Sequence, residues 1–235
     1  MKTNSELPKT LNQIIINFNF PDLFKSYIWV DDTWERGFPD LFRLEKEISS
    51  AACQNTLGRD HLVQIARWGK LPNINRIACP EPIKIGLYQN GLPASWLLSS
   101  PHNTVLLLQH QITGFGPTYI SKLLHFAIPQ VCGALDTRLV RVFGKKAQEY
   151  QLLNLYATEM DGRWAIPATQ AGWPSEYSTW IKILQSIADN LNSNRIECPH
   201  PQKYIESGLR KAGVWLPADV ETALFAYVSK KLQME

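Results

Sequence analysis

The stretch from Ile112 to Gly144, ITGFGPTYISKLLHFAIPQVCGALDTRLVRVFG, contains a glycine-rich turn between two helical patterns. Gly114 and Gly116 flank Phe115, and Pro117 suits the first turn of the second helix, where its missing N–H would lack an intrahelical partner in any case. The remaining free N–H groups, with the positive end of the helix dipole, point toward any nearby anion, for which phosphate is the usual ligand. By itself such a turn more often serves only to pack two helices.

A second motif begins 20 residues after Gly116, where the sequence ALDTR starts a further helix at Asp136. The apolar positions of that helix are Leu139, Val140, Val142 and Phe143. Aspartate is a preferred N-cap residue, so helix capping would by itself account for Asp136. A role beyond capping depends on whether the two motifs act together.

The two motifs, ITGFGP and ALDTRLVRVFG, stand in the order and at the separation found in the helix-hairpin-helix superfamily of DNA glycosylases, which this chain resembles. A closer resemblance is to the bacterial branch described as 8-oxoguanine-DNA-glycosylase-like. It rests on ISKLLHF with its proline-containing connector, on Tyr177 and Trp180, and on Asp219–Glu221 before an apolar helix. The resemblance implies a mainly α fold of the helix-hairpin-helix glycosylase type.

The resemblance also implies a function, which is to bind double-stranded DNA carrying a damaged or modified base and to hydrolyse the N-glycosidic bond of that base. The family's catalytic carboxylate matches Asp136, and a carboxylate near the anomeric carbon can stabilise the positive charge that develops on the sugar. No metal and no organic cofactor is implied. Two alternatives stay open: a non-catalytic helix-hairpin-helix DNA-binding module, and an interaction protein in which the motif only packs helices.

The lysine that acts as nucleophile in bifunctional family members is replaced by Thr118 in this chain, which predicts a monofunctional glycosylase. Lys122 lies one helical turn further on, about 6 Å along the helix axis, and its long side chain could reach back. Helical spacing places Thr118, Lys122 and His125 on one face, opposite a buried apolar stripe. Lys122 is therefore a second catalytic candidate, with an exposed lysine that contacts solvent or phosphate as the alternative.

Further side chains are expected at the DNA backbone. The candidate DNA-binding residues are Gly114, Phe115, Gly116, Thr118, His125, Arg138 and Arg141. Phe115 would either wedge against DNA or hold the two helices together. Arg138 and Arg141 lie close to two lysines, which fits a local anionic partner or a solvated helix face. The eight tryptophans offer walls for a base pocket, but the sequence selects neither a pocket nor a base.

The composition fits a folded protein of 235 residues, with 45% hydrophobic and 19% charged residues. We expect one domain over residues 1–235, with two helical halves at 1–100 and 101–235 and the hairpin motif at 103–144. A net charge of +3 and a sequence pI near 8.6 permit nucleic-acid binding without requiring it. The cysteines lack metal-ligand spacing, and no signal peptide or membrane span is apparent, which predicts a cytoplasmic protein without a structural metal.

Helical periodicity covers most of the chain, and clear alternating strands are scarce. Helices are expected near residues 40–53, 59–68, 94–99, 103–111, 117–128, 136–149, 175–191, 202–212 and 217–232. Residues 14–20 fit a strand as well as a short helix. The proline-rich stretch 72–101 is expected to form loops that join the two halves.

Overall fold

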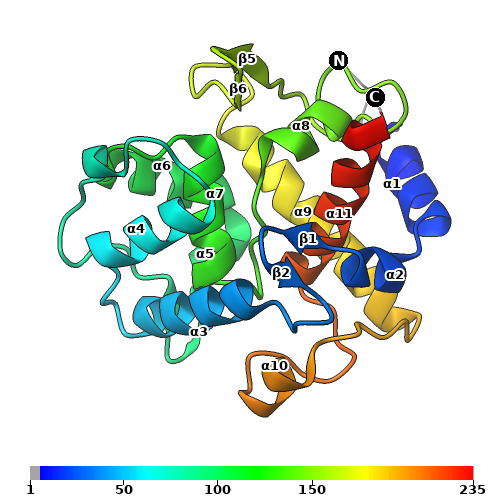
Figure 1. Cartoon of the computed structure of the whole chain (residues 1–235), viewed down its shortest axis with the longest axis horizontal. Helices are drawn as coiled ribbons and strands as arrows, with labels where there is room; N and C mark the ends of the chain where they lie inside the picture. Colours follow the sequence, from blue (N-terminus) through cyan, green and yellow to red (C-terminus); the bar gives the residue numbers. More distant parts are fainter. Residues whose placement is uncertain (1–5, 235) are drawn as a thin grey trace.

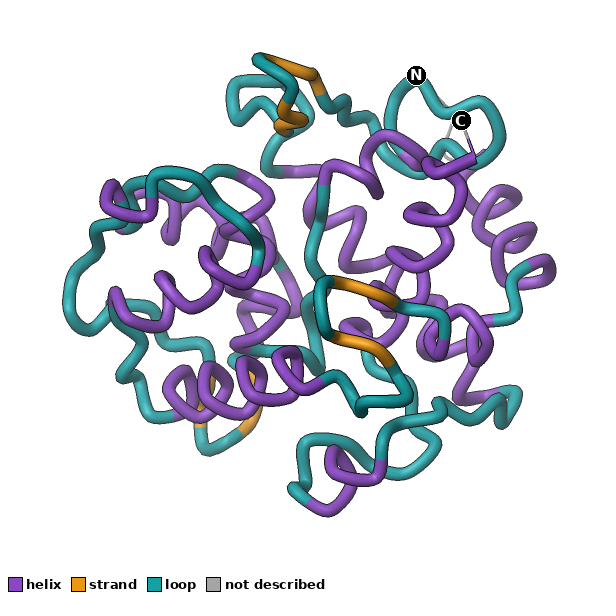
Figure 2. The backbone as a smooth tube through the Cα atoms, viewed as in Figure 1, coloured by secondary structure: helices purple, strands orange, loops and turns teal. Residues whose placement is uncertain are grey.

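Most of the described chain is helical, because apolar residues recur at helical spacing and prolines stand at the start of several segments. The computed structural model describes residues 6–234 and confirms the mainly α class. Its helices form two groups that lie side by side (Figure 1), and its strands form short hairpins (Figure 2). Across residues 6–234, no helix combines the length and the apolar character needed to cross a membrane.

The first helix group surrounds α7, which contacts α3, α4 and α6. This group consists of α3 (Pro39–Cys53), α4 (Arg59–Trp68), the 3-10 turn η1 (Ile74–Arg76), α5 (Ser95–Ser99), α6 (Pro101–Gln111) and α7 (Pro117–Ala127). The second group surrounds α11, which contacts α2, α8 and α9. It consists of α1 (Glu6–Asn17), α2 (Phe20–Lys25), α8 (Thr137–Phe143), α9 (Ser175–Ser193) and α11 (Pro217–Met234), with the short α10 (Gln202–Glu206) on the chain before α11.

The strands within residues 6–234 pair as three antiparallel hairpins. These are β1 (Ile28–Trp29) with β2 (Asp32–Thr33), β3 (Tyr88–Gln89) with β4 (Leu92–Pro93), and β5 (Thr158–Met160) with β6 (Arg163–Ala165). The β1–β2 hairpin lies where the two helix groups meet (Figure 1). Its Trp29 ring lies 5.5 Å from Nζ of Lys122 on α7 and 5.9 Å from the ring of Phe225 on α11, so the hairpin stands beside both helices.

The division between the groups differs from the predicted halves at residues 1–100 and 101–235. Helices α6 and α7 pack with α3 to α5, whereas α1 and α2 pack with α9 and α11 from the other end of the chain. The chain passes from the second group to the first after α2 and returns after α7. Long-range packing, which sequence order does not reveal, sets this division.

Three predicted elements have different ends. The helix expected at 136–149 ends at Phe143, because the backbone at Gly144 is extended. An added Cβ at Gly144 would collide with nearby backbone carbonyl oxygens, so only glycine fits where the chain turns away. The helix expected at 202–212 ends at Glu206, and Gly208 then turns the chain with φ +77. Residues 14–20 form the end of α1, a break and the start of α2 rather than a strand.

The predicted glycine turn forms between α6 and α7, and its two glycines differ in what they require. Gly114 has φ +89, a conformation that favours glycine, and an added Cβ would lie 2.9 Å from the carbonyl oxygen of Arg76. Gly116 has φ −89, and an added Cβ would meet no atom within 4 Å. The fold therefore requires glycine at the first position, while open space lies in front of the second.

We predict that Gly114→Ala destabilises the protein by about 1–3 kcal/mol, because alanine would have to adopt a left-handed φ and clash with the backbone of Arg76. Gly116→Ala is the matched control, with an expected change within about 0.5 kcal/mol. Urea unfolding followed by circular dichroism measures both free energies. Equal stability of the two variants would contradict this account of the turn.

Candidate active site

The start of α7 presents unpaired backbone N–H groups. Gly116 is the N-cap residue, and the N–H groups of Gly116 and Thr118 have no acceptor among the described residues. Phe115, by contrast, is buried, and its ring centroid lies 5.4 Å from that of Tyr119. The side chain of Phe115 thus packs against the start of α7 and does not project outward as a wedge.

Helix α7 is buried on nearly every side, which corrects the expectation that Thr118, Lys122 and His125 form a polar outer face. Lys122 keeps 6% of its surface exposed and His125 keeps 5%, while Thr118 is half-buried. Helices α3, α4 and α6 pack around α7, and residues of β1 and α11 share a cavity with Lys122 and His125. The alternative of an exposed, solvated Lys122 is therefore wrong.

The structure brings together the two residues predicted to be catalytic. Nζ of Lys122 lies 3.5 Å from Oδ2 of Asp136, and both side chains are largely buried. The other carboxylate oxygen, Oδ1, accepts a 2.8 Å hydrogen bond from the backbone N–H of Arg138 and caps α8. Capping and the contact with Lys122 coexist in Asp136, because each uses a different oxygen.

The segment that leads to Asp136 is fixed by hydrogen bonds from two helices. The hydroxyl oxygen of Ser121 on α7 accepts a 2.9 Å hydrogen bond from the backbone N–H of Leu135. The indole N–H of Trp180 on α9 donates to the carbonyl oxygen of Ala134 at 2.9 Å. Because these groups are buried, packing rather than a loose loop positions the Asp136 carboxylate.

Aromatic rings surround the ammonium group of Lys122. Its Nζ lies 5.5 Å from the ring centroid of Trp29, 5.1 Å from that of Trp68 and 5.3 Å from that of Tyr119. The negative faces of these rings attract the cation and offset part of its lost hydration. Beside the ammonium group is a cavity of about 20 Å³, whose wall also includes Tyr27, Leu41, Phe126, Ala134 and Phe225.

The same cavity wall carries a second buried pair. Nδ1 of His125 lies 3.0 Å from Oε2 of Glu221 on α11. The alignment of the two groups is not that of a hydrogen bond, so Nδ1 of His125 is buried without a hydrogen-bond partner. The carboxylate of Glu221 is nevertheless the polar group against this nitrogen, so the two side chains form a buried polar pair on the cavity wall.

Sequence reasoning missed most of this wall. Trp29 and Trp68 were two candidates among many tryptophans, and they come from β1 and α4, so no local pattern selects them. Glu221 carried a usable signal, because it stands in the apolar run VETALFAYV, where a charged residue is costly unless it is paired. That signal marks a buried polar site but not its partner.

The two predicted DNA-binding arginines of α8 stack on aromatic rings. The guanidinium carbon of Arg138 lies 5.4 Å from the ring centroids of both Trp29 and Phe225. That of Arg141 lies 4.2 Å from the ring centroid of Trp164 on β6. Both arginines are half-buried, so contact with DNA stays a prediction while packing against the rings is a second role.

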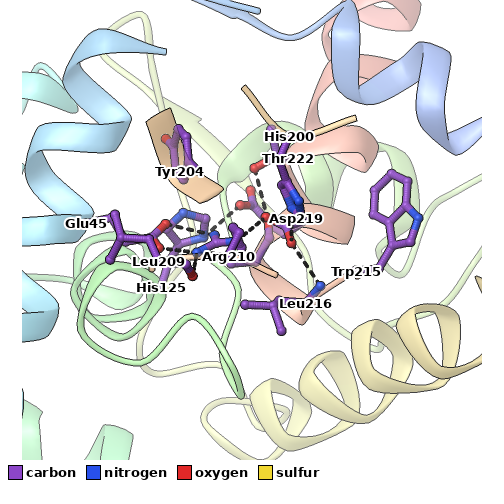
Figure 3. A network of polar contacts seen from close by, with 12 residues as sticks. Glu45, His125, His200, Tyr204, Leu209, Arg210, Trp215, Leu216, Asp219 and Thr222 are labelled. Carbon is purple, nitrogen blue, oxygen red and sulfur yellow. Dashed lines mark hydrogen bonds and ion pairs between the residues drawn. The ribbon is translucent and has the colours of Figure 1, made fainter. Parts of the chain in front are cut away.

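A buried polar cluster next to the cavity joins the two helix groups (Figure 3). Nη2 of Arg210 donates to Oε2 of Glu45 on α3 at 2.9 Å, Nη1 pairs with the other oxygen of Glu45, and Nε donates to Oδ1 of Asp219 on α11 at 2.9 Å. Oδ2 of Asp219 accepts from the backbone N–H of Leu216 and lies 3.1 Å from Nε2 of His200. One guanidinium group therefore bridges α3 and α11.

Cys198, His200 and Asp219 form the one group of histidine, cysteine and carboxylate side chains within residues 6–234 that is close enough to hold a metal ion. Both oxygens of Asp219 are already engaged by the contacts of the buried cluster. The contact between His200 and Asp219 accounts for the proximity of those two side chains.

Comparison of the chain with protein-family models, with curated proteins and with solved structures finds no match in any of the three. The features that a function has to explain are the Lys122–Asp136 pair, the aromatic wall around it and the buried His125–Glu221 pair.

The environment of Asp219 lowers its pKa. Burial alone would raise the pKa of this carboxyl group, but the positive charge of Arg210 and then that of His200 outweigh burial, and the pKa lies well below its ordinary value. A carboxyl group whose pKa falls on folding contributes stability above its unfolded pKa. That contribution is lost as the pH falls toward the folded pKa.

We therefore predict that acid destabilises the protein through Asp219, so that the free energy of unfolding falls as the pH is lowered from about 5 toward 2. Asp219→Asn is expected to flatten this dependence, and to cost about 3–5 kcal/mol at pH 7 because Arg210 loses one of its buried partners. Urea unfolding over a pH series measures both effects, with the exposed Asp22→Asn as control. An acid dependence that is unchanged in Asp219→Asn would contradict the prediction.

Proposed function

We propose that this protein is a DNA glycosylase that cleaves the N-glycosidic bond of a damaged or modified base, with Asp136 and Lys122 as its catalytic residues. The observation that carries the proposal is the 3.5 Å contact between Nζ of Lys122 and Oδ2 of Asp136, in a buried cavity lined by aromatic rings. Asp136 follows from the second glycosylase-like motif, whereas Lys122 stands one helical turn after Thr118, which occupies the position of the family's lysine. A nucleophile beside a carboxylate, next to a space walled by flat rings, suits removal of a base from a nucleotide.

The chemistry needs charge stabilisation and a nucleophile. As the base departs with the bonding electrons and takes a proton from solvent, positive charge develops on the sugar, and Oδ2 of Asp136 faces it while Oδ1 caps α8. A water molecule that gives its proton to Asp136 would leave an abasic sugar. Alternatively, the ammonium group of Lys122 would first give a proton to Asp136, and the resulting amine would bond to C1′ as the base departs and lose a second proton to solvent. Opening of the sugar ring, with the proton held by Asp136 passing to the ring oxygen, would then give a protonated imine.

The cavity wall suits a base, but the cavity must open to admit one. Base stacking on aromatic rings is worth about 1–3 kcal/mol per base, and Trp29 and Phe225 stand on the wall. Nδ1 of His125 and the carboxylate of Glu221 offer polar partners to the edge of the base. At about 20 Å³ the cavity is smaller than a nucleobase, so Trp29 and Lys122 have to move aside as it enters.

The start of α7 supplies a phosphate site at a fixed place relative to the nucleophile. The N–H groups of Gly116 and Thr118 are free, and the helix dipole is positive there. Gly116 precedes Lys122 by six residues, or about 9 Å along the helix axis. A phosphate bound at the turn would hold the backbone near the neighbouring nucleotide while its base lies at the cavity.

We predict base release from at least one member of a panel of duplexes that carry different damaged or modified bases, detected by alkaline cleavage at the abasic site. Asp136→Asn keeps a capping side chain but removes the charge, so the single-turnover rate should fall about 10²–10⁴-fold with DNA affinity nearly unchanged. The exposed Asp22→Asn is the matched control. Salt-sensitive binding without release from any duplex would instead favour the non-catalytic DNA-binding module.

A second prediction concerns the nucleophile. If Lys122 attacks the sugar, borohydride will trap a covalent complex on the duplex that is cleaved, and Lys122→Gln will abolish the trapped band, whereas the exposed Lys84→Gln will not. Thermal unfolding of each variant checks that the fold is retained. Efficient release of the base with no trapped complex would assign the attack to water and leave Lys122 as a positioning residue for Asp136.

A further inference from the structure

The tip of the β1–β2 hairpin exposes two apolar side chains beside the cavity. Ile28 is 64% exposed and Val30 is 53% exposed. Trp29, between them, points the other way and lines the cavity, as alternation along a strand requires. One face of the hairpin thus closes the cavity while the other presents apolar surface to solvent.

The backbone at Val30 is strained without a packing reason. Val30 has φ +55, a left-handed conformation that β-branched residues rarely adopt and that glycine or asparagine would take more easily. Its side chain is exposed and fills no core space. An exposed apolar residue held in a strained turn beside a candidate active site indicates a role in contact with a ligand.

The base of the hairpin is anchored, which leaves the tip as a firm projection. The carboxylate of Asp32 accepts hydrogen bonds from the backbone N–H groups of Asp40 (2.7 Å) and Leu41 (3.2 Å) at the start of α3. Its other oxygen accepts from the indole N–H of Trp68 at 3.0 Å. The indole N–H of Trp29 donates to the carbonyl oxygen of Trp68, also at 3.0 Å, and this hydrogen bond has to break when the side chain moves aside for a base.

An open groove of about 760 Å³ adjoins the tip and carries positive charge. Val30 and Trp68 lie on its wall together with the exposed cations Arg67 and Lys70, which form no ion pair among the described residues. Asp60 opposes this charge. Arg43 and Asp40, also on the wall, pair with each other at 3.3 Å, so the two free cations outweigh Asp60.

We propose that Ile28 and Val30 insert into duplex DNA at the site of the extruded nucleotide, while Arg67 and Lys70 hold the neighbouring phosphates. This inference rests on the proposed glycosylase function. Extrusion leaves a gap in the base stack, and an apolar wedge that fills the gap stabilises the extruded state. The buried Phe115 cannot reach this position, whereas the hairpin tip stands next to the Trp29 wall that the base has to pass.

The test uses variants that should fold. Val30→Asn suits φ +55 and removes the apolar surface without strain, and Ile28→Thr keeps a β-branched residue in the strand. Leu92→Thr is the matched control, because Leu92 is 69% exposed in the separate β3–β4 hairpin. The substrates are the panel duplexes with 2-aminopurine next to the target base, and the same sequences with the target in an unpaired bubble.

In the parent protein, binding is expected to raise 2-aminopurine fluorescence as the target leaves the stack. The Ile28→Thr/Val30→Asn double variant should lose this rise and excise the base at least about 10-fold more slowly from duplex, but less than about 3-fold more slowly from the bubble, where unstacking is already done. Lys70→Gln should weaken binding to all duplexes alike and lower the salt slope by about 1.

Three outcomes would overturn the wedge. If the double variant extrudes and excises the base as the parent does, the wedge proposal is refuted and the proposed glycosylase function is not. Equal slowing on duplex and bubble would show that the hairpin serves only as a cavity wall. If the parent protein neither binds the panel duplexes nor extrudes a base from any of them, both the wedge proposal and the proposed function are refuted. If the parent extrudes the base without excising it, the result supports the wedge and counts against catalysis.

Discussion

The buried guanidinium group of Arg210 is the contact on which the arrangement of the site depends. It bridges Glu45 on α3 and Asp219 on α11, and these helices belong to different groups and both contribute to the cavity wall. Desolvation offsets much of what such a network contributes to stability, but a bridge with one partner missing is very unfavourable. The network therefore acts mainly as a constraint, because it permits only the relative placement of α3 and α11 that satisfies both carboxylates.

That placement sets the surroundings of Lys122. Leu41 of α3 and Phe225 of α11 both line the cavity, and Trp29 lines it from the hairpin that Asp32 anchors to α3. A lysine surrounded in this way loses most of its hydration, so it needs both the carboxylate of Asp136 and the ring faces to compensate. Together these contacts explain how a charged side chain is held in the interior.

The sequence was enough to predict those features that depend on interactions between residues close together in the chain. The mainly α class, most helix positions, the turn at Gly114 and the capping position of Asp136 follow from periodicity, proline and glycine placement and N-cap chemistry. The burial of Lys122 could not be predicted in this way. An amphipathic pattern is interpreted on the assumption that one face of the helix meets solvent, but α7 is enclosed by segments that are distant in the chain. For the same reason the sequence did not identify Trp29 and Glu221 as cavity residues, because their place on the wall depends on long-range packing.

If the protein extrudes a base, the small cavity makes recognition a sequence of linked steps. The side chain of Trp29 both closes the cavity and shares a hairpin with the exposed Ile28 and Val30, so the contact of the tip with DNA and the opening of the wall involve the same short segment. An entering base would take over the aromatic surface that now attracts the Lys122 ammonium group, leaving Asp136 as its nearest compensating charge. Bases that unstack easily would be favoured before any edge contact with His125 or Glu221 is made. Selectivity would thus begin at the hairpin and be completed within the cavity.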